Sequence, residues 1–438
     1  MDANEKSEHR PETLAAVEAS ARGFNPEVSS RVPQAVRALR NPNFRLFWSG
    51  NFLSNIGSWM ENVARGWLIL LLTNSPLWLG VVGFAGSIPF LLFTLFGGVI
   101  ADRADKRRLL MVTQTVMMLF AFLLAALAFF KGADGKPLIT VWEVTVIAFL
   151  NGIALAMNAP SYQAMVPKLV QREDLTNAIA LNSAQFNMSR IVGPTLGGYA
   201  MAIFGVAGNF FLNGLSFLAV LWALVRLRFP EEKPVKHESM WRSLRAGFAY
   251  LRRERQMLVV VMMTSAFAFL GFPFLNFIPY FAKMQLGLDE SGLGWLMACS
   301  GFGAVLGAMT VAVLGVIRHR GVVATIFGIT FFAAIIGFSL SRNFWLSAAL
   351  ALIEGYSGIT MVSCFNVSMQ HLSSDEMRGR VLSIYTTAFL GLPPLGSLMA
   401  GWLSQYFDAG HVLAAMASTA ALIYAAFYAF SPALRSLD

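Results

Sequence analysis

Residues 75–131 read SPLWLGVVGFAGSIPFLLFTLFGGVIADRADKRRLLMVTQTVMMLFAFLLAALAFFK. Two apolar blocks, 76–101 and 108–131, flank a short charged stretch that begins at Asp102. At 1.5 Å per residue, each block is long enough to cross about 30 Å of hydrocarbon as a helix. A soluble helix would instead gather its apolar residues into a periodic stripe. The stretch therefore predicts two membrane spans joined by a charged turn.

The composition of the whole chain agrees with this prediction. Of the 438 residues, 56% are hydrophobic and 13% are charged, against roughly 25% charged residues in a soluble domain. The net charge of +9 does not indicate a nucleic-acid partner, because the Lys and Arg residues are scattered in short clusters between apolar blocks. Cys299 and Cys364 lie inside apolar blocks, so we expect no disulfide framework, no metal site and no cofactor.

The same pattern of apolar blocks continues to the end of the chain and predicts an all-α polytopic membrane protein. We expect twelve transmembrane helices in two pseudo-symmetric six-helix bundles, with both termini cytoplasmic. The blocks are 45–73, 76–101, 108–131, 140–165, 178–204, 206–228, 256–283, 290–316, 321–341, 343–368, 378–404 and 409–431. The predicted regions are an N-terminal tail (1–43), an N-terminal bundle (44–228), a linker with an amphipathic helix (229–255), a C-terminal bundle (256–432) and a C-terminal tail (433–438).

The distribution of basic residues predicts the orientation in the membrane. Of the 33 Lys and Arg, 27 fall in the tails and loops on the side of the N-terminus, and two, Arg65 and Arg190, lie inside spans. The four in outer loops are Lys131, Lys136, Lys283 and Arg342. Because cytoplasmic loops carry the excess of Lys and Arg, this count favours an even number of spans and cytoplasmic termini.

The two halves of the chain resemble each other at matching places. The second block ends in Gly98-Val-Ile-Ala-Asp-Arg103, and the eighth ends in Gly315-Val-Ile-Arg-His-Arg320. The fifth block carries Pro194-Thr-Leu-Gly197, and the eleventh carries Pro393-Pro-Leu-Gly396. Parallel repeats of this kind are typical of transporters whose binding site lies between the halves, near the bilayer midplane.

The run Gly98-x-x-x-Asp102-Arg103-x-Asp105-x-Arg107-Arg108 resembles the loop signature between spans two and three of the major facilitator superfamily. The superfamily usually has Gly where Asp105 stands, so we expect this turn to require a backbone conformation that suits Gly better than Asp, although Asp tolerates the left-handed region better than most residues. The resemblance implies a cytoplasmic gate, in which Asp102 approaches the start of the eleventh span. The gate residues are Gly98, Asp102, Arg103, Arg107, Arg108, Arg378 and Gly379. The alternative is a basic loop that only fixes topology.

The fifth block contains Gly193-Pro194-x-x-Gly197-Gly198, which resembles the antiporter signature of drug and metabolite exporters in that superfamily. The stretch from Asn41 to Leu110 is also similar to the exporter branch that contains enterobactin exporters and macrolide efflux proteins. The glycines would permit close helix approach, and Pro194 could bend the helix. A packing seam without any role in transport is the alternative.

Charged residues inside spans are candidates for proton coupling, because each is costly in the bilayer unless it is paired or hydrated. The candidates are Glu61, Arg65, Arg190 and Glu354, which we expect near the midplane around a shared interior. A buried carboxylate binds a proton more readily when an Arg partner moves away, so Glu61 or Glu354 could act as a proton switch. Permanent ion pairs that only hold spans together remain the alternative.

One face of the first span is polar along its length, and this face must line a cavity or meet other polar helices. The candidate cavity-lining residues are Asn51, Asn55, Ser58, Asn62, Asn151, Asn158, Gln185, Tyr356 and Tyr385. The seventh span is rich in Phe and interrupted by Pro273 and Pro279. Together with Trp67, such a helix would suit flat or amphiphilic substrates, although some of its Phe side chains must face lipid.

The sequence therefore predicts a secondary transporter of the cytoplasmic membrane rather than an enzyme. It has no phosphate-binding loop for an ATP-driven pump, and its five His residues lie apart in tails and loops. The resemblance implies export of a small molecule such as a siderophore, drug or metabolite, by proton antiport, with protons and the lipid bilayer as its other partners. It also implies a monomer. Uptake of a metabolite and a non-transporting sensor are the alternatives.

Overall fold

The computed structural model describes residues 34–103, 105–132, 135, 137–227, 249–314, 318–374 and 376–437, and for residues 94–103 it describes the backbone alone. Of the predicted amphipathic part of the linker, Trp241, Leu244 and Phe248 lie outside the described residues, whereas Leu251 is described and is buried in the protein. The described part is all-helical, as predicted, with one isolated β-bridge between Lys131 and Pro137.

The first half contains five long helices. They are α2 (Pro42–Thr73), α3 (Pro76–Arg103), α4 (Lys106–Phe129), α5 (Val141–Met165) and α6 (Leu175–Arg226). The short 3-10 helices η2 (Gln34–Arg40), η3 (Val166–Lys168) and η4 (Arg172–Asp174) lie before α2 and between α5 and α6. η2 is held against η4 by the ion pair between Arg37 Nε and Asp174 Oδ1, which are 2.7 Å apart.

The second half begins with a helix that is broken twice: α8 (Arg255–Ala266), the π-helix η5 (Phe267–Gly271), α9 (Phe274–Tyr280) and the π-helix η6 (Phe281–Gln285). The break after η5 falls at Pro273, because proline lacks the amide hydrogen that an uninterrupted helix needs. The remaining helices are α10 (Glu290–Leu314), α11 (Arg320–Leu340), α12 (Phe344–Leu372), α13 (Arg378–Gly391), α14 (Pro393–Leu403), α15 (Ala409–Phe430) and α16 (Pro432–Arg435).

In the described residues, ten helical segments are long and apolar enough to cross a membrane. Helix α2 has 32 residues but is not one of the ten, and its polar face lowers its mean hydropathy. Helix α6 counts once among the ten, although Gly205 interrupts it with φ 69°.

Gly205 reverses the direction of α6. The side-chain amide of Asn209 donates to the carbonyl of Gly197 at 2.8 Å, whereas these residues would be about 18 Å apart in a straight helix. The two arms of α6 therefore lie side by side. A left-handed φ is costly for any residue with a Cβ atom, so the turn depends on glycine.

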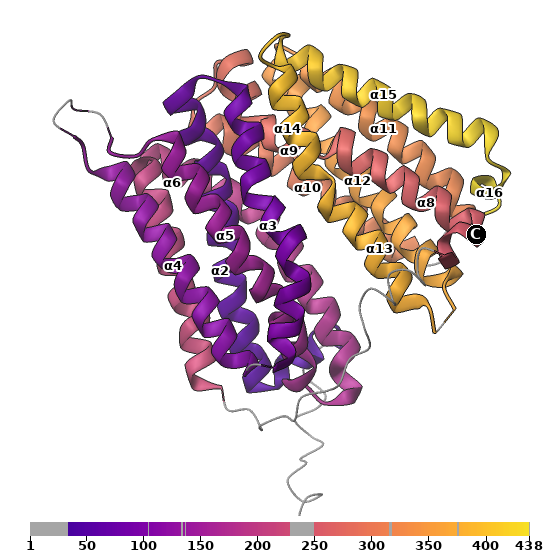
Figure 1. Ribbon diagram of the computed structural model, residues 1–438, viewed down its shortest axis with the longest axis horizontal. Helices are drawn as coiled ribbons and strands as arrows, with labels where there is room; N and C mark the ends of the chain where they lie inside the picture. The colour runs from indigo at the N-terminus through magenta and orange to yellow at the C-terminus, as the bar shows by residue number, and fades with distance from the viewer. Residues whose placement is uncertain are drawn as a thin grey trace, which may run out of the picture.

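Figure 1 shows the two halves as two helical bundles that converge at the top of the view and diverge towards the bottom. The most extensive contacts between them are those of α6 with α10 and of α3 with α14. Glycines meet in both pairs: a Cβ atom at Gly198 would come within 2.7 Å of the Gly294 Cα, and one at Gly80 within 3.0 Å of the Gly401 Cα. The two contacts are related by the internal repeat, and both hold the bundles at backbone distance.

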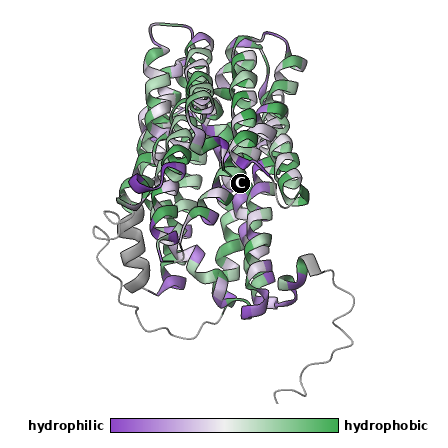
Figure 2. Ribbon diagram, turned by 90° about the vertical axis from the view of Figure 1, so that its right-hand side faces the viewer, coloured by the Kyte–Doolittle hydropathy of each residue, from purple (hydrophilic) through white to green (hydrophobic). Residues whose placement is uncertain are grey.

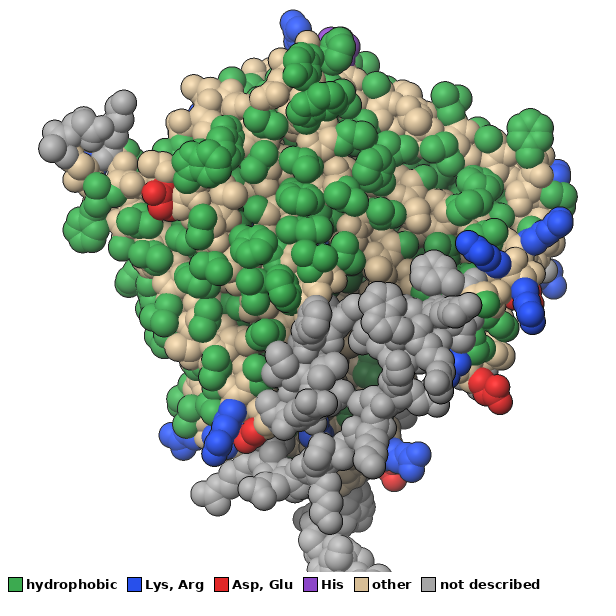
Figure 3. All heavy atoms as spheres, viewed as in Figure 1, with side chains coloured by type: hydrophobic (Ala, Val, Ile, Leu, Met, Phe, Trp, Pro, Cys, Tyr) green, Lys and Arg blue, Asp and Glu red, His purple; other side chains and the backbone are tan. Residues whose placement is uncertain are grey.

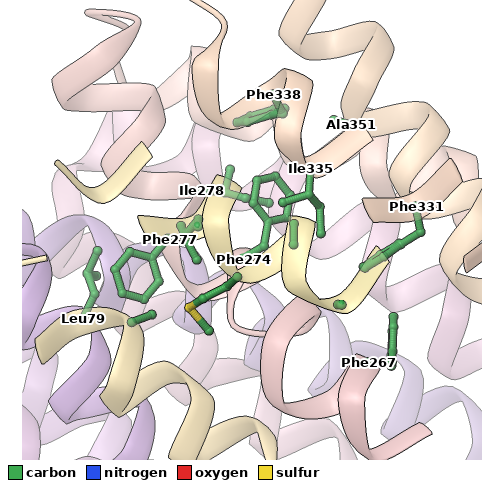
Figure 4. Close-up of a cluster of buried hydrophobic side chains, with 14 of the residues drawn as sticks. Leu79, Phe267, Phe274, Phe277, Ile278, Phe331, Ile335, Phe338 and Ala351 are labelled. Atoms are coloured by element: carbon green, nitrogen blue, oxygen red, sulfur yellow. The ribbon is translucent and has the colours of Figure 1, made fainter. Parts of the chain in front are cut away.

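The core of the second half is built from aromatic side chains of the broken helix. Phe274, Phe277 and Phe281 are fully buried, and the rings of Phe274 and Phe338 meet edge to face at 4.9 Å (Figure 4). The expectation that this span supplies aromatic side chains to a cavity therefore fails for these three rings, which fill the bundle, and holds for Phe272, which lines the cavity described below.

The outer surface of the bundles suits a lipid environment. Large apolar side chains such as Val313, Trp345 and Phe430 are more than three-quarters exposed, and green side chains cover much of the face in Figure 3. Hydrophilic residues gather at the helix ends in Figure 2. Soluble proteins rarely leave so large an apolar surface uncovered, so these helices span a membrane.

Candidate functional site

A cavity of about 440 Å³ lies between the two bundles. Its polar wall is a stripe of α2, where Asn55, Ser58, Asn62 and Arg65 follow one another at helical spacing. Asn151 of α5 adds a further amide. The second half supplies a mostly apolar wall, formed by Phe272, Leu275, Asn276, Pro279, Met297, Pro393 and Pro394.

Glu61 lies at the edge of this cavity and is held by three side chains. Its Oε1 atom is 3.4 Å from Arg65 Nη2 and accepts a hydrogen bond from the Asn151 amide at 3.5 Å. Its Oε2 atom accepts a short hydrogen bond from the Asn213 amide of α6. Both carboxylate oxygens therefore have donors, which a buried charge requires.

Arg65 is less enclosed than its partner. Its side chain is 20% exposed, compared with 4% for Glu61, and it lines the cavity. Within the described residues, the contact with Glu61 is the only ion pair or hydrogen bond of its guanidinium. Of the two groups, the Glu61 carboxylate is therefore buried in the bundle, and the Arg65 guanidinium is the one that is partly open to the cavity.

The structure separates Arg190 and Glu354 from this pair, although the sequence had grouped all four charges around one interior. Neither residue is among those that line the cavity. Glu354 of α12 accepts a hydrogen bond from Ser300 Oγ of α10 at 2.7 Å, and Arg190 of α6 acts on it electrostatically. These three residues lie where α6, α10 and α12 pack together.

The cavity brings together four of the predicted lining residues, Asn55, Ser58, Asn62 and Asn151. The other five are not among its lining residues. Asn51 donates to the Phe47 carbonyl, Asn158 donates to Thr113 Oγ1, and Tyr356 donates to Thr310 Oγ1. Gln185 and Tyr385 are both buried, and the hydroxyl of Tyr385 interacts with the Thr264 side chain.

The antiporter-like glycines of α6 contact two different helices. Cβ atoms at Gly193 and Gly197 would press on α2 near Trp59 and Met60, whereas one at Gly198 would press on α10. Pro194 does not interrupt α6, whose one non-helical residue is Gly205. Through these glycines, α6 packs tightly against α2 on one side and against α10 of the second bundle on the other.

Part of the predicted cytoplasmic gate lies beyond the described side chains. The backbone of α3 passes through Gly98 and reaches Arg103, but the side chains of Asp102 and Arg103 are outside the described set, so the expected approach of Asp102 to Arg378 stays a prediction. Arg378 and Gly379 begin α13, and a Cβ atom at Gly379 would meet open space.

The described part of this loop anchors α4. Arg107 donates through Nε and Nη2 to the Leu224 and Val225 carbonyls at the end of α6, at 2.7 and 2.8 Å, and Arg108 Nε is 3.7 Å from Asp105 Oδ2. Asp105 has φ −61° and caps α4 by accepting from two backbone amides. The expectation that position 105 needs a glycine-like conformation is therefore wrong for this chain, because Asp105 serves as an ordinary helix N-cap.

Two functional-site amides were missed in the sequence. Asn213 reaches Glu61 from 152 positions away in the chain, and Asn276 lines the cavity while donating to Ser397 Oγ at 3.0 Å. Each is an amide in a mostly apolar span, which is the signal that would have identified them.

A third missed feature joins the halves above the cavity. Lys283 Nζ of η6 donates to the Leu70 carbonyl at 3.1 Å and to Asn74 Oδ1 at 3.3 Å, both at the end of α2. Trp67 Nε1 of α2 donates to Glu290 Oε1 of α10 at 3.0 Å, so Trp67 belongs to this junction and does not line the cavity. We call Trp67, Leu70, Asn74, Lys283 and Glu290 the outer junction, after the side of the membrane on which the sequence analysis placed Lys283.

Comparisons with known proteins agree with the architecture. The family model for transmembrane secretion effectors matches residues 34–438. The staphyloferrin A transporter of Staphylococcus aureus (strain NCTC 8325 / PS 47) is 25% identical over 393 residues, which cover 88% of this chain and 95% of that protein. The multidrug efflux pump Tap of Mycolicibacterium fortuitum is 25% identical over 391 residues, covering 87% and 94%.

A solved structure has the same fold. A bacterial homolog of the human lysosomal transporter Spinster, in an inward-facing and unoccupied conformation, gives a TM-score of 0.67 at 16% identity, covering 91% of this chain and 97% of that chain. Membrane-length helices in two bundles with a central cavity define a multi-pass membrane transporter. The chain belongs to the transmembrane secretion effector family of the major facilitator superfamily, which confirms the superfamily that the sequence motifs predicted.

Proposed function

We propose that this protein exports small organic molecules across the cytoplasmic membrane by proton antiport with alternating access. The observation that carries the proposal is the Glu61–Arg65 pair on the wall of a cavity between two bundles. A buried carboxylate beside a cation that can move is suited to take up and release protons. The efflux function in the name of the Tap relative supports export over uptake.

The proposed topology has twelve spans and cytoplasmic termini. It takes the ten apolar segments, divides α6 at Gly205, and adds α2. The proposed bundles are residues 44–228 and 256–432, joined by a cytoplasmic linker at 229–255. The excess of Lys and Arg in the tails and in the loops on the same side of the membrane as the N-terminus supports this orientation.

The proposed conformation is inward-facing. The bundles diverge towards the bottom of Figure 1 and converge at the top, and the outer junction joins α2 to η6 and α10. Opening to the outside would break this junction, while the cytoplasmic ends would close through the loop that contains Asp102. A change between two such arrangements is the usual form of alternating access.

Export should depend on the carboxylate of Glu61. Ethidium, macrolides and catecholate siderophores are screened in cells that express the protein. We expect at least one of them to accumulate less than in control cells, and a protonophore to cancel this difference. Glu61→Gln keeps the shape of the side chain but removes the exchangeable proton, so accumulation should return to the control level at equal expression. Glu354→Gln tests the second carboxylate in the same way.

Glu173→Gln is the matched control, because Glu173 is an exposed carboxylate of the loop before α6 and its partner Arg37 keeps the ion pair with Asp174. Its export should equal that of the unmodified protein. Greater accumulation in expressing cells would show uptake instead, and export that persists in Glu61→Gln with full protonophore sensitivity would remove Glu61 from the mechanism.

A further inference from the structure

We infer that Arg65 is a binding site for an anionic group of the transported molecule, so that the cavity selects amphiphilic organic carboxylates. The inference rests on the proposed function and adds the chemical class of the substrate. It starts from the unequal placement of the two charges of the Glu61–Arg65 pair relative to the cavity.

The charge that faces the cavity is positive. In the described part of the chain, Glu61 and Arg65 are the two charged residues that line it, and Glu61 is the more deeply buried of the two. Both oxygens of Glu61 already accept from donors, and two of these donors are the amides of Asn151 and Asn213. A cation offered to this carboxylate would have to displace them, whereas an anion meets Arg65 directly.

The guanidinium of Arg65 has unused hydrogen-bonding capacity. It carries five N–H donors in a planar fork, and Nη2 faces Glu61 at 3.4 Å. No other hydrogen bond or ion pair of this group is present in the described part of the chain. A carboxylate matches the free edge of such a fork, and the pairing is strong where water is largely excluded.

The other lining residues indicate the chemistry of the rest of the ligand. Asn62 and Ser58 place an amide and a hydroxyl further along the same stripe of α2, and Asn276 faces them from the second bundle. Trp59, Phe186 and Phe272 supply aromatic surface. A flat apolar body with a few hydroxyl or carbonyl groups and one carboxylate complements this wall.

The test compares two dyes with the same xanthene ring system and opposite charge, carboxyfluorescein and rhodamine 6G. The full-length protein is placed in lipid nanodiscs, and binding is followed by fluorescence anisotropy, with empty nanodiscs as the background. We expect saturable binding of carboxyfluorescein that weakens about 10- to 100-fold in Arg65→Gln, the loss typical of a charge-assisted pair. Arg65→Lys, which keeps the charge but not the fork, should lie between the two.

Two further variants separate this role from a purely structural one. Arg342→Gln removes an exposed Arg outside the cavity and should bind carboxyfluorescein like the unmodified protein. Glu61→Gln removes the negative charge beside Arg65 and should bind the anion more tightly, even though its proton-driven export is lost. Equal unfolding temperatures of Arg65→Gln and the unmodified protein show that both are folded.

The inference is overturned if Arg65→Gln binds carboxyfluorescein within about twofold of the unmodified protein. It is also overturned if the unmodified protein binds rhodamine 6G but shows no saturable binding of carboxyfluorescein. Either result leaves the proposed export untouched, because export is judged by protonophore sensitivity in cells. Conversely, anion binding at Arg65 without proton-driven export would support the site and refute the proposed function.

Discussion

Replacing Lys283 with alanine is expected to make the cavity about tenfold more accessible from the outside. Lys283 bonds the Leu70 carbonyl and Asn74 across the boundary between the bundles, and its Nζ lies 6.0 Å from the centre of the Trp67 ring. These contacts must break when the outer side opens. A hydrogen bond to a charged group contributes about 1.5–3 kcal/mol, which is enough to change a two-state population by roughly a factor of ten.

Cysteine labelling measures this change. Ser87 lines the cavity, so Ser87→Cys, in a chain whose two native cysteines are replaced by serine, reports entry of a membrane-impermeant maleimide into spheroplasts. Labelling should be slow in this background and about tenfold faster after Lys283→Ala. Lys131→Ala, at an exposed outer lysine, is the control. Equal labelling rates in all three proteins would mean that the outer junction does not hold the two bundles together.

A large loss of stability is expected from Gly303→Val. A Cβ atom at Gly303 of α10 would overlap the backbone carbonyl oxygen of Leu352 in α12, and neither helix can yield without moving its neighbours. Overpacking of a core costs about 1–3 kcal/mol, and a clash with backbone instead of a flexible side chain places this change at or above about 3 kcal/mol. The folded fraction after detergent extraction, followed by size-exclusion chromatography, should fall sharply.

Gly337→Ala is the matched comparison within the same bundle. The nearest atom to a Cβ at Gly337 is 3.1 Å away and belongs to the flexible side chain of Leu350. Alanine also favours the helical state over glycine, so this variant should be extracted as well as the unmodified protein. If Gly303→Val were equally well folded, α10 and α12 would have to separate more easily than their contact in the structure implies.

The sequence was sufficient for the parts of the fold that depend on local pattern. Apolar blocks predicted the long helices, and Pro273 and Pro279 predicted a disrupted seventh span. The block boundary predicted near Val206 corresponds to the reversal at Gly205, whose φ of 69° suits glycine. Helix α2 was also predicted, as the block 45–73, although its polar face keeps it out of the ten most apolar segments.

The site was predictable where its residues are close in the chain. Glu61 and Arg65 are one helical turn apart, so their pairing follows from spacing. Asn213 reaches Glu61 only because α6 reverses at Gly205 and its second arm packs beside α2. Lys283 likewise meets α2 only once the two bundles are in contact. A single sequence carries no direct signal for such distant pairs, and for the same reason it did not separate Glu354 from Glu61.

Among the described residues that line the cavity, the charged groups belong to the first bundle, and the second bundle contributes one amide, Asn276, among apolar side chains. Under the proposed mechanism, a solute would therefore remain bound to the polar residues of the first bundle while the second bundle rotates relative to it. The same polar contacts would accompany the solute from loading to release. The two sides of the membrane would then differ little in intrinsic affinity, and the direction of transport would come from the proton gradient.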